Sequence, residues 1–553
     1  MMTFNYSRNN LSREDRRLER FLEILPGALS WMIIIGMSVL SMAQPLVAAA
    51  IMVAFVLFWV LRLLYMNLFL TISYTRLSIE KETDWMALVC GVDDLDKTIK
   101  DFQARCRAKG SFTMKMMASL RYRQLAALKQ SGSLPPRSSD IYHLVILPVA
   151  KETRDIIEPS IQSLSQGMYL SKRALVVIAL ESRAADDVKR DVAAVQQKYA
   201  SCFMDLLVVE HPSDIEGESR VKGANATWAA KSAAEYLNAK GIPYENVIVS
   251  CFDADTVAHR EYLACLTYYF MITPSRTRAS YQPIPVYYNN LWDVPSFARI
   301  IDIGASFFQL VESTNTEKLV TFSSHSMSFK ALVEVGYWPV DMISDDSAIF
   351  WKSFIHYDGQ YQVVPIYTTV SMDIAGGKTV WQTFLNIYKQ KRRWAWGVEN
   401  LPIVIRAFLS SKKISLYKKV MFGTRLFDMF ISWATWSFLL TVITWLPTLF
   451  AGREFATTTM YYMAPRIKDI IFSLSLIGLL VCMVISLALL STSTTRQRFS
   501  QKILHVFDWL AIPFVILLLS SVPALDAQTR LMFGRYMEFK VTRKYRPTAD
   551  KQP

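Results

Sequence analysis

Cysteine is scarce in this sequence and shows no pattern that indicates a cross-link. The 553 residues include six cysteines, and no two of them form a C-x-x-C pair. This spacing leaves no readable disulfide framework or zinc site, so we expect reduced thiols in a cytosolic compartment. We also expect no cleavable signal, because the charged stretch SREDRRLER comes first and no small-residue cleavage site follows it.

No recognised nucleic-acid-binding module is present either, although the chain is basic. The net charge of +14 favours an anionic partner, which leaves phospholipid headgroups, nucleic acid or a phosphorylated substrate as candidates. The basic residues are spread over segments beside apolar blocks. We therefore expect contact with membrane lipids and no nucleic-acid partner.

Long apolar blocks alternate with soluble ones, which explains why the chain is 52% hydrophobic and 20% charged. Blocks at roughly 26–43 and 46–70 each approach the ~20 residues that cross a bilayer, and they predict a membrane hairpin. A buried helix pair in a soluble core is the alternative. Five arginines before the hairpin place the amino terminus in the cytosol by the positive-inside rule: Arg8, Arg13, Arg16, Arg17 and Arg20.

Apolar character returns near the carboxyl terminus. Blocks at 429–450 and 470–490 predict two further spans, while a third block at 505–527 is interrupted by two prolines. The tail beyond it is basic, so a single crossing would place positive charge outside. A re-entrant segment within 505–535 would avoid that conflict, and both arrangements remain open.

The central part of the chain has the pattern of an α/β domain. From Tyr142 onward, β-branched runs alternate with helical stretches, which indicates a mostly parallel sheet covered on both faces. The runs lie at 143–149, 173–181, 203–210 and 246–255. The last run ends in CFDADT, where Asp253 and Asp255 provide oxygen ligands that suit Mg²⁺ or Mn²⁺ at the carboxyl end of a strand. A solvated aspartate turn is the alternative.

Two further stretches have both a chemical and a structural interpretation. In RVKGANATWA, Lys222 and Gly223 begin a predicted helix and would hold an anion, unless the lysine is simply solvated. In ISDDSAIFW, Asp345 and Asp346 precede an apolar helical run. They would supply a general base for an acceptor hydroxyl, or merely complete a helix N-cap beside Ser344.

The ordered set of motifs is more specific than any one of them. PVAKE, ALESR, KGAN, DAD, SDD and QKRRW follow one another between residues 148 and 394, with apolar spans on both flanks. This order resembles the membrane-bound family 2 glycosyltransferases, the group of cellulose, hyaluronan and chitin synthases. The resemblance implies a cytosolic GT-A-type (Rossmann-like) α/β domain flanked by transmembrane and interfacial helices. It also implies an integral protein of the plasma (inner) membrane.

The resemblance also implies roles for single residues. Contacts with the nucleotide sugar would come from Glu152, Glu181, Lys222 and Asp253, although the family usually has Asp where Glu181 stands. Asp255 would bind Mg²⁺ or Mn²⁺. Asp346 would be the general base; Asp345 stands where the family has Glu, so which of the two acts stays open. Residues around the acceptor and the diphosphate would be Gln390, Arg393, Trp394 and His325, the last of which is unusual at that place and would otherwise be a polar loop residue.

The tail adds one more similarity, because FKVTRK at 539–544 resembles the gating-loop motif of cellulose synthases. Its matching residues are Phe539, Val541, Thr542 and Lys544. The whole organisation that we expect is a tail at 1–25, a hairpin at 26–75, a basic helical connector at 76–140, the transferase domain at 141–375, interface helices at 376–421, a membrane region at 422–538 and the gating-like tail at 539–553.

The expected reaction is inverting, metal-dependent transfer of a sugar from a nucleotide-sugar donor, most simply a UDP-sugar, to a growing polysaccharide. Transfer of one sugar to a lipid or polyprenyl acceptor is the alternative within the same class. A membrane translocation or scaffold protein with a non-catalytic transferase-like domain is the alternative of another class. On the helix that carries QKRRW, we expect one face to serve the sugar-transfer site and Lys389, Lys391 and Arg392 to contact lipid headgroups.

Overall fold

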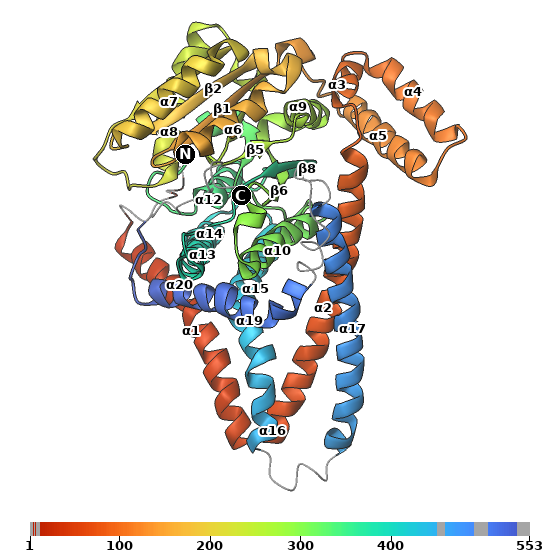
Figure 1. Ribbon diagram of the computed structural model, residues 1–553, viewed down its shortest axis with the longest axis vertical. Coiled ribbons are helices and arrows are strands. Elements are labelled where there is room, and N and C mark those ends of the chain that lie inside the picture. The colour runs from red at the N-terminus through yellow and green to blue at the C-terminus, as the bar shows by residue number, and fades with distance from the viewer. Residues whose placement is uncertain (1–3, 5, 7–10, 451–458, 491–506, 539–553) are drawn as a thin grey trace, which may run out of the picture. The chain divides into compact units, whose positions relative to one another are not determined.

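The computed structural model describes the chain apart from residues 1–3, 5, 7–10, 451–458, 491–506 and 539–553 (Figure 1). The chain divides into two compact units. The first contains Leu77–Pro285 and Asn315–Met372. The second contains the described residues of 2–76, 286–314 and 373–553. The gating-like motif at 539–544 lies outside the described residues.

An eight-stranded sheet forms the centre of the first unit, in the order β3-β2-β1-β4-β7-β6-β8-β5. Its strands are β1 Tyr142–Val149, β2 Ala174–Glu181, β3 Asp205–His211, β4 Val247–Cys251, β5 Val257–Ala258, β6 Ala279–Val286, β7 His325–Ser328 and β8 Gln362–Ser371. The pairs β2–β3, β1–β2 and β1–β4 are parallel. The pairs β4–β7, β6–β7 and β5–β8 are antiparallel.

The α/β class is therefore confirmed, but the prediction of a mostly parallel sheet is wrong for its second half. The parallel half consists of the β-branched runs that the sequence displays, and every residue of β2 is buried, as expected for a strand covered on both faces. Strand β7 instead reads HSMS. Such a short polar stretch gives no strand signal by composition, so the antiparallel strand between β4 and β6 could not be read from the sequence.

Helices join and cover the strands of this unit. They are α3 Trp85–Asp93, α4 Leu95–Arg107, α5 Phe112–Ser131, α6 Arg154–Ser165, α7 Asp186–Tyr199, α8 Lys222–Ala239, α9 Tyr262–Ile272, α11 Phe329–Glu334 and α12 Asp345–His356. Helices α6, α7 and α8 each connect two of the parallel strands, because a parallel pair needs a crossover rather than a tight turn.

Helix α8 is fixed closely at its first turn. The Asn225 side chain donates a hydrogen bond of 2.7 Å to the carbonyl oxygen of Ala179 in β2. Gly223 lies so close to the loop before α12 that a Cβ atom there would be 2.4 Å from the carbonyl oxygen of Pro339. The glycine and asparagine of KGAN thus place the start of α8 against both β2 and the α12 loop.

The second unit is helical. Its elements are α1 Arg13–Ala43, α2 Pro45–Glu80, which continues into the first unit, α10 Ser296–Glu312, α13 Val380–Ala395, α14 Asn400–Ser410, α15 Leu416–Thr441, α16 Leu446–Phe450, α17 Thr459–Leu490, α19 Ile512–Ile516 and α20 Val522–Met532. Within the described chain, three helical segments are long and apolar enough to cross a membrane: 13–43, 45–80 and 512–532. Segments 416–441 and 443–450 form a fourth if their 42° bend lies within one span.

The segment at 512–532, which ends in α20, lies across other helices of its unit. Figure 1 shows α20 running across the long axes of α1 and α15. The Gln528 side chain accepts a hydrogen bond from the Ser30 hydroxyl of α1 at 2.7 Å and donates one to the carbonyl oxygen of Phe430 in α15 at 2.7 Å. Length and composition alone therefore do not establish that this segment spans a membrane, because it crosses α1 and α15 and is hydrogen-bonded to both.

Crowding at Gly223 predicts that Gly223→Ala destabilises the protein by about 1–3 kcal/mol, the usual cost of overpacking. The added methyl group would meet the carbonyl of Pro339, which is backbone and has little room to shift. The measurement is the midpoint of thermal unfolding in detergent.

Gly304→Ala is the matched control, because this exposed helical glycine has no atom within 4 Å of a built Cβ among the described residues. Alanine should be neutral or stabilising there by up to about 1 kcal/mol. Equal midpoints for the two variants would contradict the close approach at Gly223.

Candidate active site

Acidic residues gather where the parallel strands end. Glu152 follows β1, Glu181 is the last residue of β2, and Asp253 follows β4 by two positions. Because these strands are parallel neighbours, their carboxyl ends meet at one edge of the sheet. Ligands of α/β sheets bind outside that edge.

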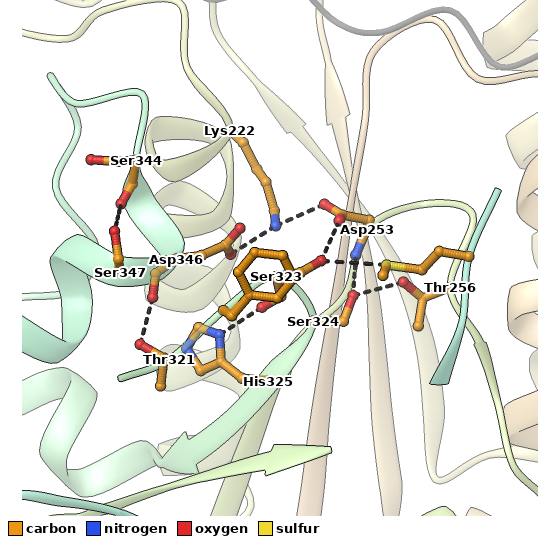
Figure 2. Close-up of polar contacts among 12 residues, drawn as sticks. Lys222, Asp253, Thr256, Thr321, Ser323, Ser324, His325, Ser344, Asp346 and Ser347 are labelled. Carbon is orange, nitrogen blue, oxygen red and sulfur yellow. Dashed lines mark hydrogen bonds and ion pairs between the residues drawn. The ribbon is translucent and has the colours of Figure 1, made fainter. Parts of the chain in front are cut away.

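An ion-pair cluster of Lys222, Asp253 and Asp346 occupies this edge, as Figure 2 shows. The Lys222 ammonium lies 2.9 Å from Oδ1 of Asp253 and 3.1 Å from Oδ1 of Asp346. Its side chain is 10% exposed, whereas those of Asp253 and Asp346 are 34% and 27% exposed. Burial disfavours the charged lysine, but the two carboxylates outweigh it and raise the pKa of Lys222 well above its usual value.

A loop of serines fixes Asp253 from the other side. The Ser323 hydroxyl donates to Oδ2 of Asp253 at 2.9 Å, and the Asp253 backbone N–H donates to the Ser324 hydroxyl at 3.1 Å. Ser324 also bonds the Thr256 hydroxyl at 2.7 Å. Ser323 has a φ of 46°, which is uncommon for a residue with a Cβ and is typical of functional loops.

His325 supports this loop from beneath. It is 1% exposed, pairs with Cys251 across β4 and β7, and its Nδ1 lies 2.8 Å from the carbonyl oxygen of Ser323. Burial lowers the pKa of His325, although Asp346 and the Ser323 carbonyl act in the opposite direction. The buried imidazole thus helps to fix the loop, while its contact with the acceptor stays a prediction.

The two aspartates of SDD differ in their surroundings. Ser344 is the N-cap of α12, and both acids lie in its first turn, where the helix dipole favours negative charge. Asp345 is buried at 4% exposure, while Asp346 lies beside Lys222. The Thr321 hydroxyl donates to the backbone carbonyl of Asp346 at 2.6 Å, which fixes that turn. Asp346 is therefore the more accessible carboxylate of the pair.

Glu152 and Glu181 both have protein contacts at the strand ends. The Glu152 carboxylate accepts the backbone N–H groups of Ala150 and Lys151 at 2.8 and 2.9 Å. Glu181 lies 3.2 Å from Nε of Arg183 and 3.6 Å from Nδ1 of His211. The predicted site residues did not include His211, Thr321, Ser323 or Ser324. His211 directly follows the β-branched run predicted at 203–210, and this position is the signal that could have found it.

The oxygen donors of this site fit a divalent cation that is also bound by water and phosphate oxygens. Among the described residues, no group of three or more His, Cys, Asp or Glu side chains could hold a metal. Asp253 and Asp346 nevertheless direct two carboxylate oxygens at one point, where the Lys222 ammonium now lies. Mg²⁺ is commonly held by one or two carboxylates together with water and phosphate. Asp255 is 2% exposed, and its role as a ligand stays a prediction.

The QKRRW motif lies on α13, in the helical unit. Gln390 is buried, and the Trp394 ring lies 6.3 Å from the Tyr287 ring and 3.5 Å from the Lys391 ammonium. Arg393 is partly exposed on the same helix. Since the ion-pair cluster belongs to the other unit, the acceptor role of this motif stays a prediction.

The expectation that Lys391 contacts lipid headgroups is wrong, while that for the partly exposed Arg392 stays a prediction. Lys391 is 3% exposed and pairs with buried Asp302, and burial lowers its pKa against the effect of that carboxylate. Arg392 donates to Asp526 of α20 at 2.8 Å. Lys389 is exposed, as expected. The local charge pattern could not reveal these acids, because distant segments supply them.

Comparison with known proteins shows that part of the chain matches a known family. Residues 248–520 match the family described as Glycosyl transferase family group 2. The chain contains a family 2 glycosyltransferase domain. The match includes Asp253, Asp346 and Trp394 but begins after Lys222. The α/β class with apolar helices before and after it is thus the one that the resemblance implied.

Relatives of known function are similar to this chain over a short part of its length. Poly-beta-1,6-N-acetyl-D-glucosamine synthase of Staphylococcus epidermidis is 33% identical over 91 residues, which cover 16% of this chain and 19% of the relative. The Staphylococcus aureus (strain COL) protein of the same name is 32% identical over 84 residues, covering 15% and 18%. The chain therefore spans about a fifth of the length of these relatives in the matched region.

Solved structures share a slight likeness with the chain. The mannosyltransferase PcManGT of Pyrobaculum calidifontis, in complex with GDP-Man and Mn²⁺, has a TM-score of 0.39 and 14% identity, covering 70% of this chain and 99% of that one. TarS of S. aureus has a TM-score of 0.30 and 13% identity, covering 61% and 54%.

The buried pair on α13 yields a prediction about stability. Lys391→Met should destabilise the protein by about 3–5 kcal/mol, because it leaves the Asp302 carboxylate buried without its cation. The double variant Lys391→Met with Asp302→Leu should recover most of that loss. Thermal unfolding midpoints of the three proteins measure this.

Lys389→Met is the control on the same helix, since Lys389 is exposed and its removal should change the unfolding midpoint little. If Lys391 bound lipid headgroups instead, Lys391→Met would lower membrane affinity and leave the unfolding midpoint unchanged.

Proposed function

We propose that the protein transfers a sugar, with inversion, from a nucleotide-sugar donor to a growing polysaccharide at the membrane. The observation that supports it most is the cluster of Lys222, Asp253 and Asp346, brought from three distant segments to the strand-end edge of the sheet. The similarity to relatives named as polysaccharide synthases favours the polymerising reaction over transfer of one sugar. Helices long enough to span a membrane favour action at a membrane.

The chemistry needs one proton acceptor and charge neutralisation. An acceptor hydroxyl would attack the anomeric carbon while Asp346 takes its proton, and a single displacement inverts that carbon. The leaving diphosphate carries negative charge, so it needs cations rather than a proton donor. The Lys222 ammonium would supply one of these at the edge of the site, where N–H groups of the first turn of α8 also lie.

A bound Mg²⁺ or Mn²⁺ would neutralise the same diphosphate and would be held through Asp253, with Asp255 as its second predicted ligand. Glu181 and Glu152 lie at the ends of the neighbouring strands. On that edge they would contact the base or ribose of the donor, which we take to be a UDP-sugar. The partners would then be this donor, a saccharide acceptor and membrane lipids.

Purified protein in Mg²⁺ or Mn²⁺ should release nucleoside diphosphate from one member of a panel of nucleotide sugars. UDP-N-acetylglucosamine is the first donor to try, given the names of the relatives. Product size on a gel then separates a polymer from a single transfer. If no donor turns over while the protein still unfolds cooperatively, the proposed enzymatic activity is wrong. That result would favour a scaffold role.

The two acids of SDD should differ in their effect. Asp346→Asn should lower the turnover rate by about 10²- to 10⁴-fold, the usual contribution of general base catalysis. Asp345→Asn should instead lower the unfolding midpoint more than the rate, because Asp345 is buried. Initial rates of diphosphate release and thermal unfolding, measured on the same preparations, distinguish these effects. The opposite pattern would make Asp345 the base.

A further inference from the structure

Lys222 occupies the place that a divalent cation would need. Its ammonium lies 2.9 and 3.1 Å from one oxygen each of Asp253 and Asp346. Those two side chains are the partly exposed carboxylates of the site, while Asp255 and Asp345 are buried. A cation that uses these oxygens must therefore replace the lysine or share them with it. The lysine acts as an internal stand-in for the ion.

Local charge favours joint entry of donor and metal. One lysine and two carboxylates leave the cluster with a single negative charge when all are ionised. A diphosphate alone would add like charge beside Asp253, and a divalent cation alone would be repelled by the Lys222 ammonium. Entering together, the two opposite charges offset each other.

We propose that Lys222 is the counter-ion of the donor-free site and moves from Asp253 and Asp346 to the donor's diphosphate when donor binds. This movement opens the carboxylates to a divalent cation and leaves Asp346 able to accept the proton of the acceptor hydroxyl. The inference rests on the proposed function, because it assumes a nucleotide diphosphate as the ligand. It makes metal and donor binding cooperative and keeps the Asp346 carboxylate paired with Lys222 until donor arrives.

The position of Lys222 suits such a movement. It is the first residue of α8, so its flexible stem projects from a helix start whose backbone N–H groups favour an anion. Gly223 and Asn225 fix the backbone next to it. Only the side chain has to turn, and the partly exposed Asp253 marks the side from which a ligand would enter.

Binding of Mn²⁺, followed by electron paramagnetic resonance on the full-length protein, tests this without turnover. The probes are Mn²⁺ alone and Mn²⁺ with saturating UDP or, in a separate series, GDP. In the unaltered protein the nucleotide should tighten Mn²⁺ binding by roughly 5- to 150-fold, the usual range for coupled sites. In Lys222→Met, Mn²⁺ should bind on the order of tenfold more tightly than in the unaltered protein before any nucleotide is added.

Lys231→Met is the matched control. Lys231 lies on the same helix with an exposed side chain, and its replacement removes the same charge. It should leave Mn²⁺ affinity within about twofold, which separates a local effect from that of net charge. Adding Asp253→Asn to Lys222→Met should cancel the gain. Lys222→Gln serves if Lys222→Met unfolds at a lower temperature.

Unchanged Mn²⁺ affinity in both Lys222 variants would overturn the inference, even if the enzyme turns over a nucleotide sugar. Conversely, a gain in Lys222→Met that Asp253→Asn cancels would uphold the competition between lysine and metal. If that gain occurred in a protein that turns over no donor, the proposed function would fail while the competition stood. The two results are thus distinguishable.

Discussion

The contact of one ammonium with two carboxylates is the constraint on which the strand-end site depends. Lys222 begins α8, Asp253 follows β4, and Asp346 lies in the first turn of α12. Two partly buried carboxylates this close would repel one another without a cation between them. The lysine therefore both positions the acids and sets the charge that any ligand meets.

Small side chains let these three segments approach. Glycine at position 223 leaves room for the Pro339 carbonyl, and serines at 323 and 324 bind Asp253 through hydroxyl groups of little bulk. Their hydrogen bonds satisfy buried polar groups that would otherwise be costly. The left-handed backbone of Ser323 is the conformational cost of turning the loop under Asp253.

Sequence order revealed the charged residues of this cluster but not what surrounds them. Strand β4 and the start of α8 were readable because β-branched runs and KGAN are local signals. Strand β7 was not, because HSMS becomes a strand only by pairing with β4 and β6. The partners of Lys391 and Arg392 were invisible for the same reason, since Asp302 and Asp526 lie 89 and 134 positions away.

The aspartate at 345, where the family has a longer glutamate, fits this crowded geometry. A Cβ built on Gly223 would be 3.2 Å from the Cβ of Asp345, so α8 and α12 approach each other at this residue. One more methylene group at 345 would have to be accommodated in that packed space. Asp346, one position further round the helix, turns instead toward Lys222. Close helix packing thus leaves the second acid as the more exposed of the two.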